Sequence, residues 1–230
     1  MPLYTPREIP LNWYQYDVRF STELLREYIR GVEAQIATTI ESFHREKEIC
    51  VSDDILEEEG PSLTKIYRGL DSDAWNLNAI FEYLFPNLQR RSALITLFSF
   101  FEHELDALCD LFIRTEKILV SLNDMRGTGI DRSILFLIKI VGLPVDKNTA
   151  LWQEIKNVQK IRNLIVHNDG KLKDRSGNAV GDLIKYIGAS PHLSGADEVE
   201  ICDGYLAKVI ETFDLQFKEI DKLIQARRRT

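Results

Sequence analysis

Residues 160–170, KIRNLIVHNDG, combine side-chain types that can act on a phosphate ester. Histidine has the ordinary pKa closest to neutrality, so it can take or give a proton at physiological pH. The arginine guanidinium can hold a phosphate through two parallel N–H donors and stabilise charge that develops on it. Arg162 and His167 are therefore the candidate catalytic residues, and Asn163 is a candidate supporting residue.

Helical spacing decides which of these side chains can meet. At about 100° per residue, Asn163 and His167 are four positions apart and share one face. Asn163 could there fix the orientation and tautomer of the imidazole. Arg162 falls on the apolar stripe with Leu151 and Ile155, about 140° from His167. The two side chains can meet if the helix becomes irregular near His167. They can also meet if a two-fold axis brings Arg162 of one chain next to His167 of another.

The same helix is apolar almost all round between residues 161 and 166, because Leu164 and Val166 fall off the stripe. Such a helix needs apolar cover on two sides. Its own bundle supplies one side, and a second subunit could supply the other.

The rest of the chain predicts an all-α fold that holds this helix. Apolar residues recur at helical spacing over 21–49, 91–116, 150–168 and 203–228, and four such helices can close into a bundle. Ser21 or Thr22 could cap the first helix, and Thr149 is expected to begin the third. The third is expected to stop at Asn168-Asp169-Gly170, where Asn and Gly tolerate the left-handed conformation.

The remaining segments are expected to be insertions around one domain, residues 21–230. Residues 1–20, with three prolines, predict an irregular N-terminal arm, and the acidic stretch 52–72 predicts a loop. A short helix is expected near 73–84, ended by Pro86, and a buried helix over 131–141. Val199 and Ile201 alternate with glutamates, which predicts a short β-hairpin near 180–202.

Composition places the chain among ordinary globular proteins. Of its 230 residues, 44% are hydrophobic and 28% charged. No apolar run is long enough to span a bilayer, the N-terminus does not resemble a signal peptide, and the three cysteines fit a reducing compartment. A cytoplasmic protein is therefore expected. The net charge of −7 argues against a broadly basic surface, although residues 151–175 hold six basic and three acidic side chains.

The sequence Arg162-Asn163-Leu164-Ile165-Val166-His167, at the end of a bundle helix, resembles the signature of the HEPN domains. These domains occur in prokaryotic toxin–antitoxin pairs and antiviral defence systems. Their pattern is Arg, four to six residues, then His, with Asn, Asp or His directly after the Arg. The bundle extends the resemblance loosely over 21–228, and the long segment 50–86 departs from a minimal HEPN bundle, which leaves the subfamily open.

The resemblance implies a homodimeric, metal-independent endoribonuclease without a cofactor, acting as a toxin or antiviral-defence effector. RNA would be the substrate, and an antitoxin or other regulatory protein would restrain it. Two alternatives stay open. One is a HEPN-like dimerisation module that binds RNA or protein without cutting, and the other is a structural bundle in which Arg162 pairs with a core carboxylate.

Other side chains are given smaller roles or none. Glu102 lies at the edge of the 91–116 stripe and could pair with Arg162, although a boundary carboxylate facing water is favoured. His103 falls on the polar face, and His44 and His192 have no partner pattern. No second histidine stands at metal-ligand spacing from His103, so no metal site is expected. Cys109 lacks a paired histidine, and Trp75 and Trp152 are expected to lie in the core.

Overall fold

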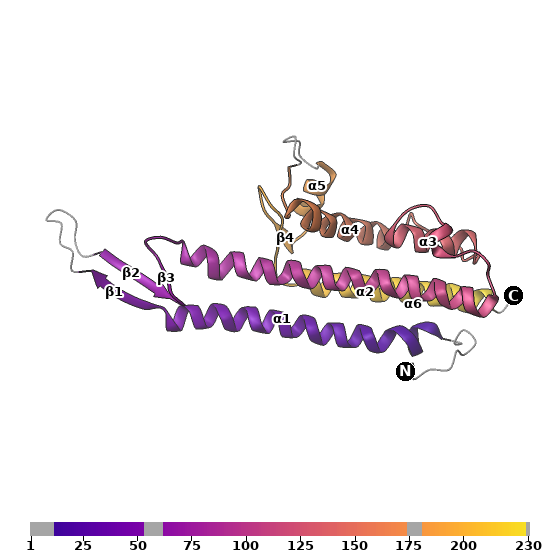
Figure 1. Cartoon of the computed structure of the whole chain (residues 1–230), viewed down its shortest axis with the longest axis horizontal. Helices are drawn as coiled ribbons and strands as arrows, with labels where there is room; N and C mark the ends of the chain where they lie inside the picture. The colour runs from indigo at the N-terminus through magenta and orange to yellow at the C-terminus, as the bar shows by residue number, and fades with distance from the viewer. Residues whose placement is uncertain (1–11, 53–61, 174–180, 229–230) are drawn as a thin grey trace.

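The structure, a computed structural model, describes residues 12–52, 62–173 and 181–228. It is a helical bundle of four long helices, α1 (Arg19–Glu46), α2 (Phe85–Glu116), α4 (Ala150–Asn168) and α6 (Tyr205–Arg227) (Figure 1). The expected all-α fold and its four bundle helices are confirmed.

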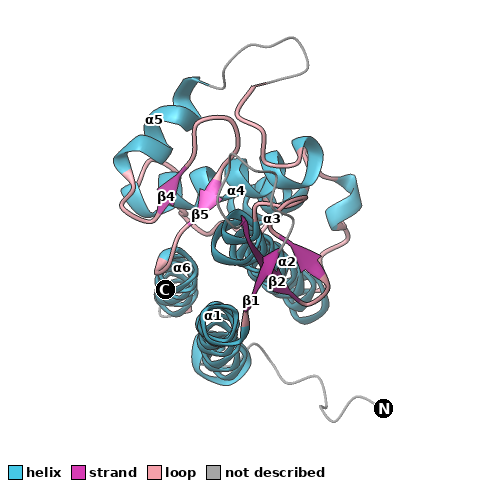
Figure 2. Ribbon diagram, turned by 90° about the vertical axis from the view of Figure 1, so that its left-hand side faces the viewer, coloured by secondary structure: helices cyan, strands magenta, loops and turns pink. Residues whose placement is uncertain are grey.

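The core of the bundle forms around α2, which packs against α1, α4 and α6. Seen along the bundle, α4 lies over α2 and α6 on the side away from α1 (Figure 2). Phenylalanine rings join α2 to α6: Phe101 stacks on Phe213 with ring centroids 4.3 Å apart, and both are fully buried. This apolar packing fixes the relative positions of the helices that carry the candidate site.

Helix α3 (Gly129–Lys139) packs on α2, preceded by the short 3₁₀ turn η3 (Leu122–Asp124). Ile130, Ile134 and Leu137 are fully buried, so the prediction of a buried helix over 131–141 is confirmed. Helix α4 begins at its N-cap residue Thr149 as expected, and the Thr149 side chain caps it by accepting a hydrogen bond from the Trp152 N–H.

Helix α1 and the start of α2 extend past α4 and α6 and end at a small antiparallel sheet (Figure 1). Its strands are β1 (Glu48–Ser52), β2 (Ser62–Tyr67) and β3 (Leu70–Asp71). The predicted loop over 52–72 is therefore wrong for 62–71, and its residues 53–61 lie outside the described part. Arg68 and Gly69, with φ of 50° and 77°, form the two-residue turn that pairs β2 with β3.

A second, smaller apolar cluster of Phe43, Tyr67, Leu77 and Phe81 ties this sheet to α1 and to the helix that enters α2. Phe43 and Phe81 stack with centroids 5.1 Å apart. The Tyr67 hydroxyl is buried without a hydrogen-bond partner among the described residues.

Pro86 does not end a helix, which corrects the prediction for 73–84. The π-helical turn η2 (Ala79–Leu84) runs directly into α2, and Pro86 lies in the first turn of α2. The Phe85 N–H donates to the Ile80 carbonyl, five residues back. The wider π turn accommodates a residue that has no N–H to donate and whose ring would crowd an ordinary α turn.

The N-terminal arm is also shorter than expected. Residues 1–11 lie outside the described part, whereas the π-helical turn η1 (Tyr14–Val18) continues into α1. Trp13 and Val18 are buried in the main core, and the Tyr14 N–H donates to Asp221 on α6 at 3.0 Å. Thr22 does not cap α1, because its hydroxyl donates to the Val18 carbonyl within the helix.

Trp152 is buried as expected, but Trp75 is 54% exposed and does not belong to the core. It lies in the turn between β3 and η2, beside a polar hollow of about 430 Å³. The predicted hairpin near 180–202 is confirmed in its second half as β4 (Leu193–Ser194) and β5 (Glu200–Ile201). Its first half forms the helix α5 (Gly181–Ala189) instead.

Candidate active site at the α2–α4 interface

Arg162 reaches from α4 toward α2 and is half-buried, with 23% of its side chain exposed. Its guanidinium lies over the Phe98 ring, 5.6 Å from the centroid, and Nη1 donates to the Asn163 side-chain oxygen at 3.0 Å. Nε is buried and finds no hydrogen-bond partner in the described part of the chain. Arg162 therefore uses few of the five N–H donors of its guanidinium in hydrogen bonds.

Glu102 on α2 is the acid nearest to Arg162, with Oε2 3.6 Å from Nη2. This distance makes an ion pair but is too long for a good hydrogen bond. Burial raises the pKa of Glu102, and the positive charge of Arg162 only partly opposes that rise. The favoured expectation of a carboxylate facing water is thus wrong, because α4 and Gly129 both approach this side chain.

A second pair of opposite charges lies one turn further along α2. Asp106 accepts hydrogen bonds from Arg132 on α3 at 3.1 Å and from the Ser133 hydroxyl. Sequence reasoning missed both Asp106 and Arg132. The i, i+4 spacing of Glu102 and Asp106 on the edge of the α2 stripe is the signal that could have found the acid.

His167 lies on the outside of α4 and is exposed, and its ring has no hydrogen bond or ion pair with another described residue. Asn163 shares its face but gives its side-chain oxygen to Arg162. The expected Asn163–His167 contact is therefore not among the interactions of the described chain.

Helix α4 stays regular through Asn168, and the chain turns only at Asp169, with φ of 52°. The expectation that the helix loosens at His167 is wrong. On a regular helix, Arg162 and His167 point about 140° apart. Within one chain Arg162 faces α2 while His167 faces outward. The two side chains can therefore share a site only if Arg162 comes from one chain and His167 from another.

The C-terminal end of α4 is held by Arg91, a residue that sequence reasoning missed. Arg91 on α2 is buried, and its guanidinium donates to the carbonyl oxygens of Asp169 at 3.3 Å and Val199 at 2.8 Å. Its Nη atoms also lie 3.7 Å from the Asp169 carboxylate and 3.4 Å from that of Glu198. Gly170, with φ of 76°, leaves room for it, since a Cβ there would lie 2.5 Å from Nη2.

This anchoring matters for His167, which stands two residues before the turn. Asn168 donates from its side-chain amide to the carbonyls of Lys171 and Lys173, at 2.7 and 2.9 Å. The Gly170 N–H donates to the Leu164 carbonyl, which closes the helix. The backbone that carries the imidazole is thus fixed on both sides of the turn.

Among the described residues, the remaining histidines and Cys109 form no second candidate site. His44 lies 3.5 Å from Glu82, the His192 ring contacts the Asp203 carbonyl at 2.7 Å, and His103 is exposed. Burial raises the pKa of the Cys109 thiol, which opposes a role as nucleophile. Over the described ranges, no group of three or more His, Cys, Asp or Glu side chains could hold a metal, and no helix is long and apolar enough to cross a membrane.

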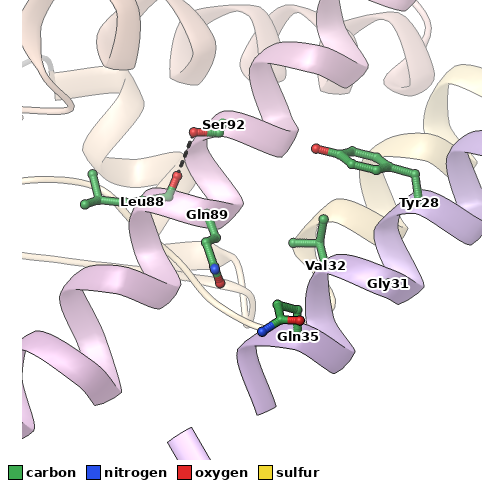
Figure 3. Close-up of a pocket in the computed structure, with 7 residues that line it drawn as sticks. All are labelled: Tyr28, Gly31, Val32, Gln35, Leu88, Gln89 and Ser92. Carbon is green, nitrogen blue, oxygen red and sulfur yellow. Dashed lines mark hydrogen bonds between the residues drawn. The ribbon is translucent and has the colours of Figure 1, made fainter. Parts of the chain in front are cut away.

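A hollow of about 560 Å³ lies between α1 and α2, away from Arg162 and His167 (Figure 3). Tyr28, Val32 and Gln35 line it from α1, and Gln89 and Ser92 from α2. Figure 3 shows the Leu88 side chain pointing away from the α1 residues. The hollow has no carboxylate, histidine or cation in its lining, so it offers little for acid–base chemistry.

Comparison of the chain with protein-family models, with curated proteins and with solved structures finds no match. The geometry of the side chains therefore has to carry the functional argument.

Proposed function

We propose that the protein is a metal-independent endoribonuclease of the HEPN type that acts as a homodimer, in which Arg162 and His167 are the catalytic residues. The observation that carries the proposal is the state of Arg162. Its guanidinium is held in place by Glu102 and Phe98, and its two Nη groups make one hydrogen bond between them, to Asn163, while Nε is buried. A preorganised guanidinium with free donors is suited to a phosphate.

The proposed reaction uses these two side chains on an RNA phosphodiester. His167 takes the proton of the ribose 2′-hydroxyl, and the 2′-oxygen forms a bond to phosphorus. The bond from phosphorus to the 5′-oxygen breaks, and that oxygen leaves with a proton from water. Arg162 stabilises the charge on the phosphoryl oxygens. The products are a 2′,3′-cyclic phosphate and a 5′-hydroxyl, and DNA is not cut because it lacks the 2′-hydroxyl.

An exposed apolar side chain beside Arg162 supports a second subunit. Val166, one turn after Arg162, is 46% exposed. It lies on the stretch of α4 that the sequence predicts to be apolar almost all round, residues 161–166. A partner that covers it would supply the second apolar cover that α4 needs.

The first test is RNA cleavage in EDTA by the wild type, His167→Ala and Arg162→Ala. Losing the general base is expected to lower the rate by about 10²–10⁴-fold, and losing the guanidinium by about 10²–10³-fold. His103→Ala is the matched control, because His103 is also an exposed histidine on a helix. An intact RNA after incubation with folded wild-type protein would refute the nuclease and favour the non-catalytic binding module.

The second test asks whether two chains share one site. In a mixed dimer of Arg162→Ala and His167→Ala subunits, one composite site has both residues intact and the other has neither. Mixing the two inactive variants is therefore expected to restore up to half of the activity per mixed dimer. Sites built within single chains would stay inactive after mixing, and sedimentation would show whether the dimer forms at all.

We propose further that the protein is cytoplasmic and serves as a toxin or antiviral-defence effector restrained by a regulatory protein, since an unrestrained ribonuclease would harm its own cell. Expression of the wild type is then expected to arrest growth, whereas His167→Ala is tolerated. Equal toxicity of the two forms would separate the cellular effect from RNA cleavage.

A further inference from the structure

Two lysines, an asparagine and a histidine follow one another along the outer face of α4. Lys156, Lys160, Asn163 and His167 are spaced by four, three and four residues, so they share one face of the helix. Lys160 and His167 are exposed, and the two turns between them correspond to about 10.5 Å along the axis. Lys156 is engaged, since it donates to Asp131 at 2.6 Å.

This face has no carboxylate of its own. The one acidic residue of α4, Glu154, is turned toward α5 and α6, where it accepts hydrogen bonds from Tyr186 and pairs with Lys208, both at 2.6 Å. Asp131 of α3 pairs with Lys156, so Lys160 is the lysine of this face that no carboxylate of the described residues neutralises.

Lys171 follows the turn that ends α4, four residues after His167. Its carbonyl accepts from the Asn168 amide, its N–H donates to the Asn168 carbonyl at 3.0 Å, and it bridges to Glu198 through the backbone. The backbone of Lys171 is therefore fixed relative to His167, while its side chain is exposed. Among the described residues, neither Lys160 nor Lys171 has a side-chain hydrogen bond or ion pair, so both ammonium groups are available to a ligand.

We propose that Lys160 and Lys171 bind the phosphates on either side of the one at His167, so that a single strand of RNA runs along the outer face of α4. The proposal rests on the nuclease function and names its substrate as single-stranded RNA held by its backbone. Lys160 and Lys171 stand on either side of His167 in the sequence, and lysine contacts to phosphate carry no sequence information. Binding is thus expected to depend on salt and little on base sequence.

The test measures the affinity of a fluorescent 2′-O-methyl oligoribonucleotide, which cannot be cleaved, over a range of salt concentrations. Lys160→Gln and Lys171→Gln are each expected to reduce the slope of log Kd against log salt by about 0.7, which is about a fivefold weaker affinity at 0.1 M salt. Lys139→Gln is the control, because Lys139 is an exposed lysine on α3. The melting temperature of each variant shows that it is folded.

The outcome is independent of cleavage. If the lysine variants bind RNA as tightly as Lys139→Gln does, with the same salt slope, the RNA path is refuted even when the wild type cuts RNA. If they lose affinity while the wild type does not cut, the path stands and the nuclease fails. The proposal would also be overturned if neither lysine variant changed the affinity for RNA while an acidic protein bound the wild type but not Lys160→Gln. The outer face of α4 would then be a protein-binding surface.

Discussion

Arg91 and Arg162 cross the same interface between α2 and α4 from opposite sides, yet their guanidinium groups are used differently. Both Nη atoms of Arg91 are engaged by backbone carbonyls and carboxylates. Arg162 makes one hydrogen bond, to Asn163, and a longer ion pair with Glu102. Nε is buried without a partner in both, so the difference lies in the Nη groups.

The comparison separates an arginine that stabilises the fold from one that is available for a ligand. Arg91 joins three segments, α2, the end of α4 and the β4–β5 hairpin, and its removal takes one donor each from the carbonyls of Asp169 and Val199. Arg162 is oriented by its neighbours but is not saturated by them. Burial and a positive charge alone would have ranked Arg91 higher as a site residue, and only the count of its partners reverses the order.

The largest effect on stability is expected for Arg91→Met. The Asp169 carbonyl loses its donor, the Val199 carbonyl keeps only the longer bond from Asn87, and two carboxylates lose their cation, so the free energy of unfolding should fall by about 3 kcal/mol. Arg162→Met should cost about 1 kcal/mol, since it removes one hydrogen bond and one long ion pair. Urea denaturation of both variants measures the difference. Equal losses would make Arg162 a structural arginine and favour the plain helical bundle.

A smaller effect is expected for Gly170→Ala, which places a Cβ 2.5 Å from Nη2 of Arg91. The cost should be about 2 kcal/mol, part from the positive φ and part from displacing the guanidinium. Gly142→Ala is the matched control, because Gly142 has φ of 78° and no atom within 4 Å of its Cβ position. It should cost about 1 kcal/mol. Equal decreases in melting temperature for the two variants would mean that the Arg91 side chain moves away from the new Cβ without a loss of stability.

The smallest effect is a pH dependence at Glu102. Burial raises the pKa of Glu102 in the folded protein above its value in the unfolded chain. The stability that Glu102 contributes is therefore fully present at a pH below its unfolded-state pKa, and it is lost as the pH rises through its folded-state pKa. The stability of the wild type relative to Glu102→Gln should therefore fall from acid toward neutral pH, by less than about 1 kcal/mol. Urea titrations at several pH values measure it.

Asp214 provides the opposite case for this measurement. Burial acts to raise its pKa, but hydrogen bonds from Lys218, Tyr14 and Arg26 outweigh burial and lower it. The extra stability of the wild type over Asp214→Asn should be fully present at a pH above the unfolded-state pKa of Asp214. It should be lost as the pH falls through the folded-state pKa of Asp214. If the stability difference between the wild type and Glu102→Gln changed with pH in the same direction as that for Asp214→Asn, Glu102 would be fully paired, like Asp214.

Several features could be predicted from the sequence because they depend on neighbours along the chain. Periodicity predicted the four bundle helices, and Thr149 and Asn168-Asp169-Gly170 predicted both ends of α4, since capping and the left-handed turn involve residues within one turn. The 140° between Arg162 and His167 also follows from their spacing on a regular helix.

Local signals failed where a later segment decides the structure. Pro86 stays inside a helix because a π turn precedes it, and residues 62–71 form strands because Tyr67 packs on Phe43 and Phe81. Trp75 is exposed because its turn lies outside that cluster.

The candidate site divides in the same way. The sequence by itself determined which residue types stand on α4 and in which direction each one points. Only the tertiary structure decided that Glu102 faces Arg162, that both Nη groups of Arg91 are engaged, and that Lys160, His167 and Lys171 remain exposed. Partners brought from α2, α3 and the β4–β5 hairpin determine burial and charge pairing, and their approach depends on the packing of the whole bundle and not on any one stretch of chain.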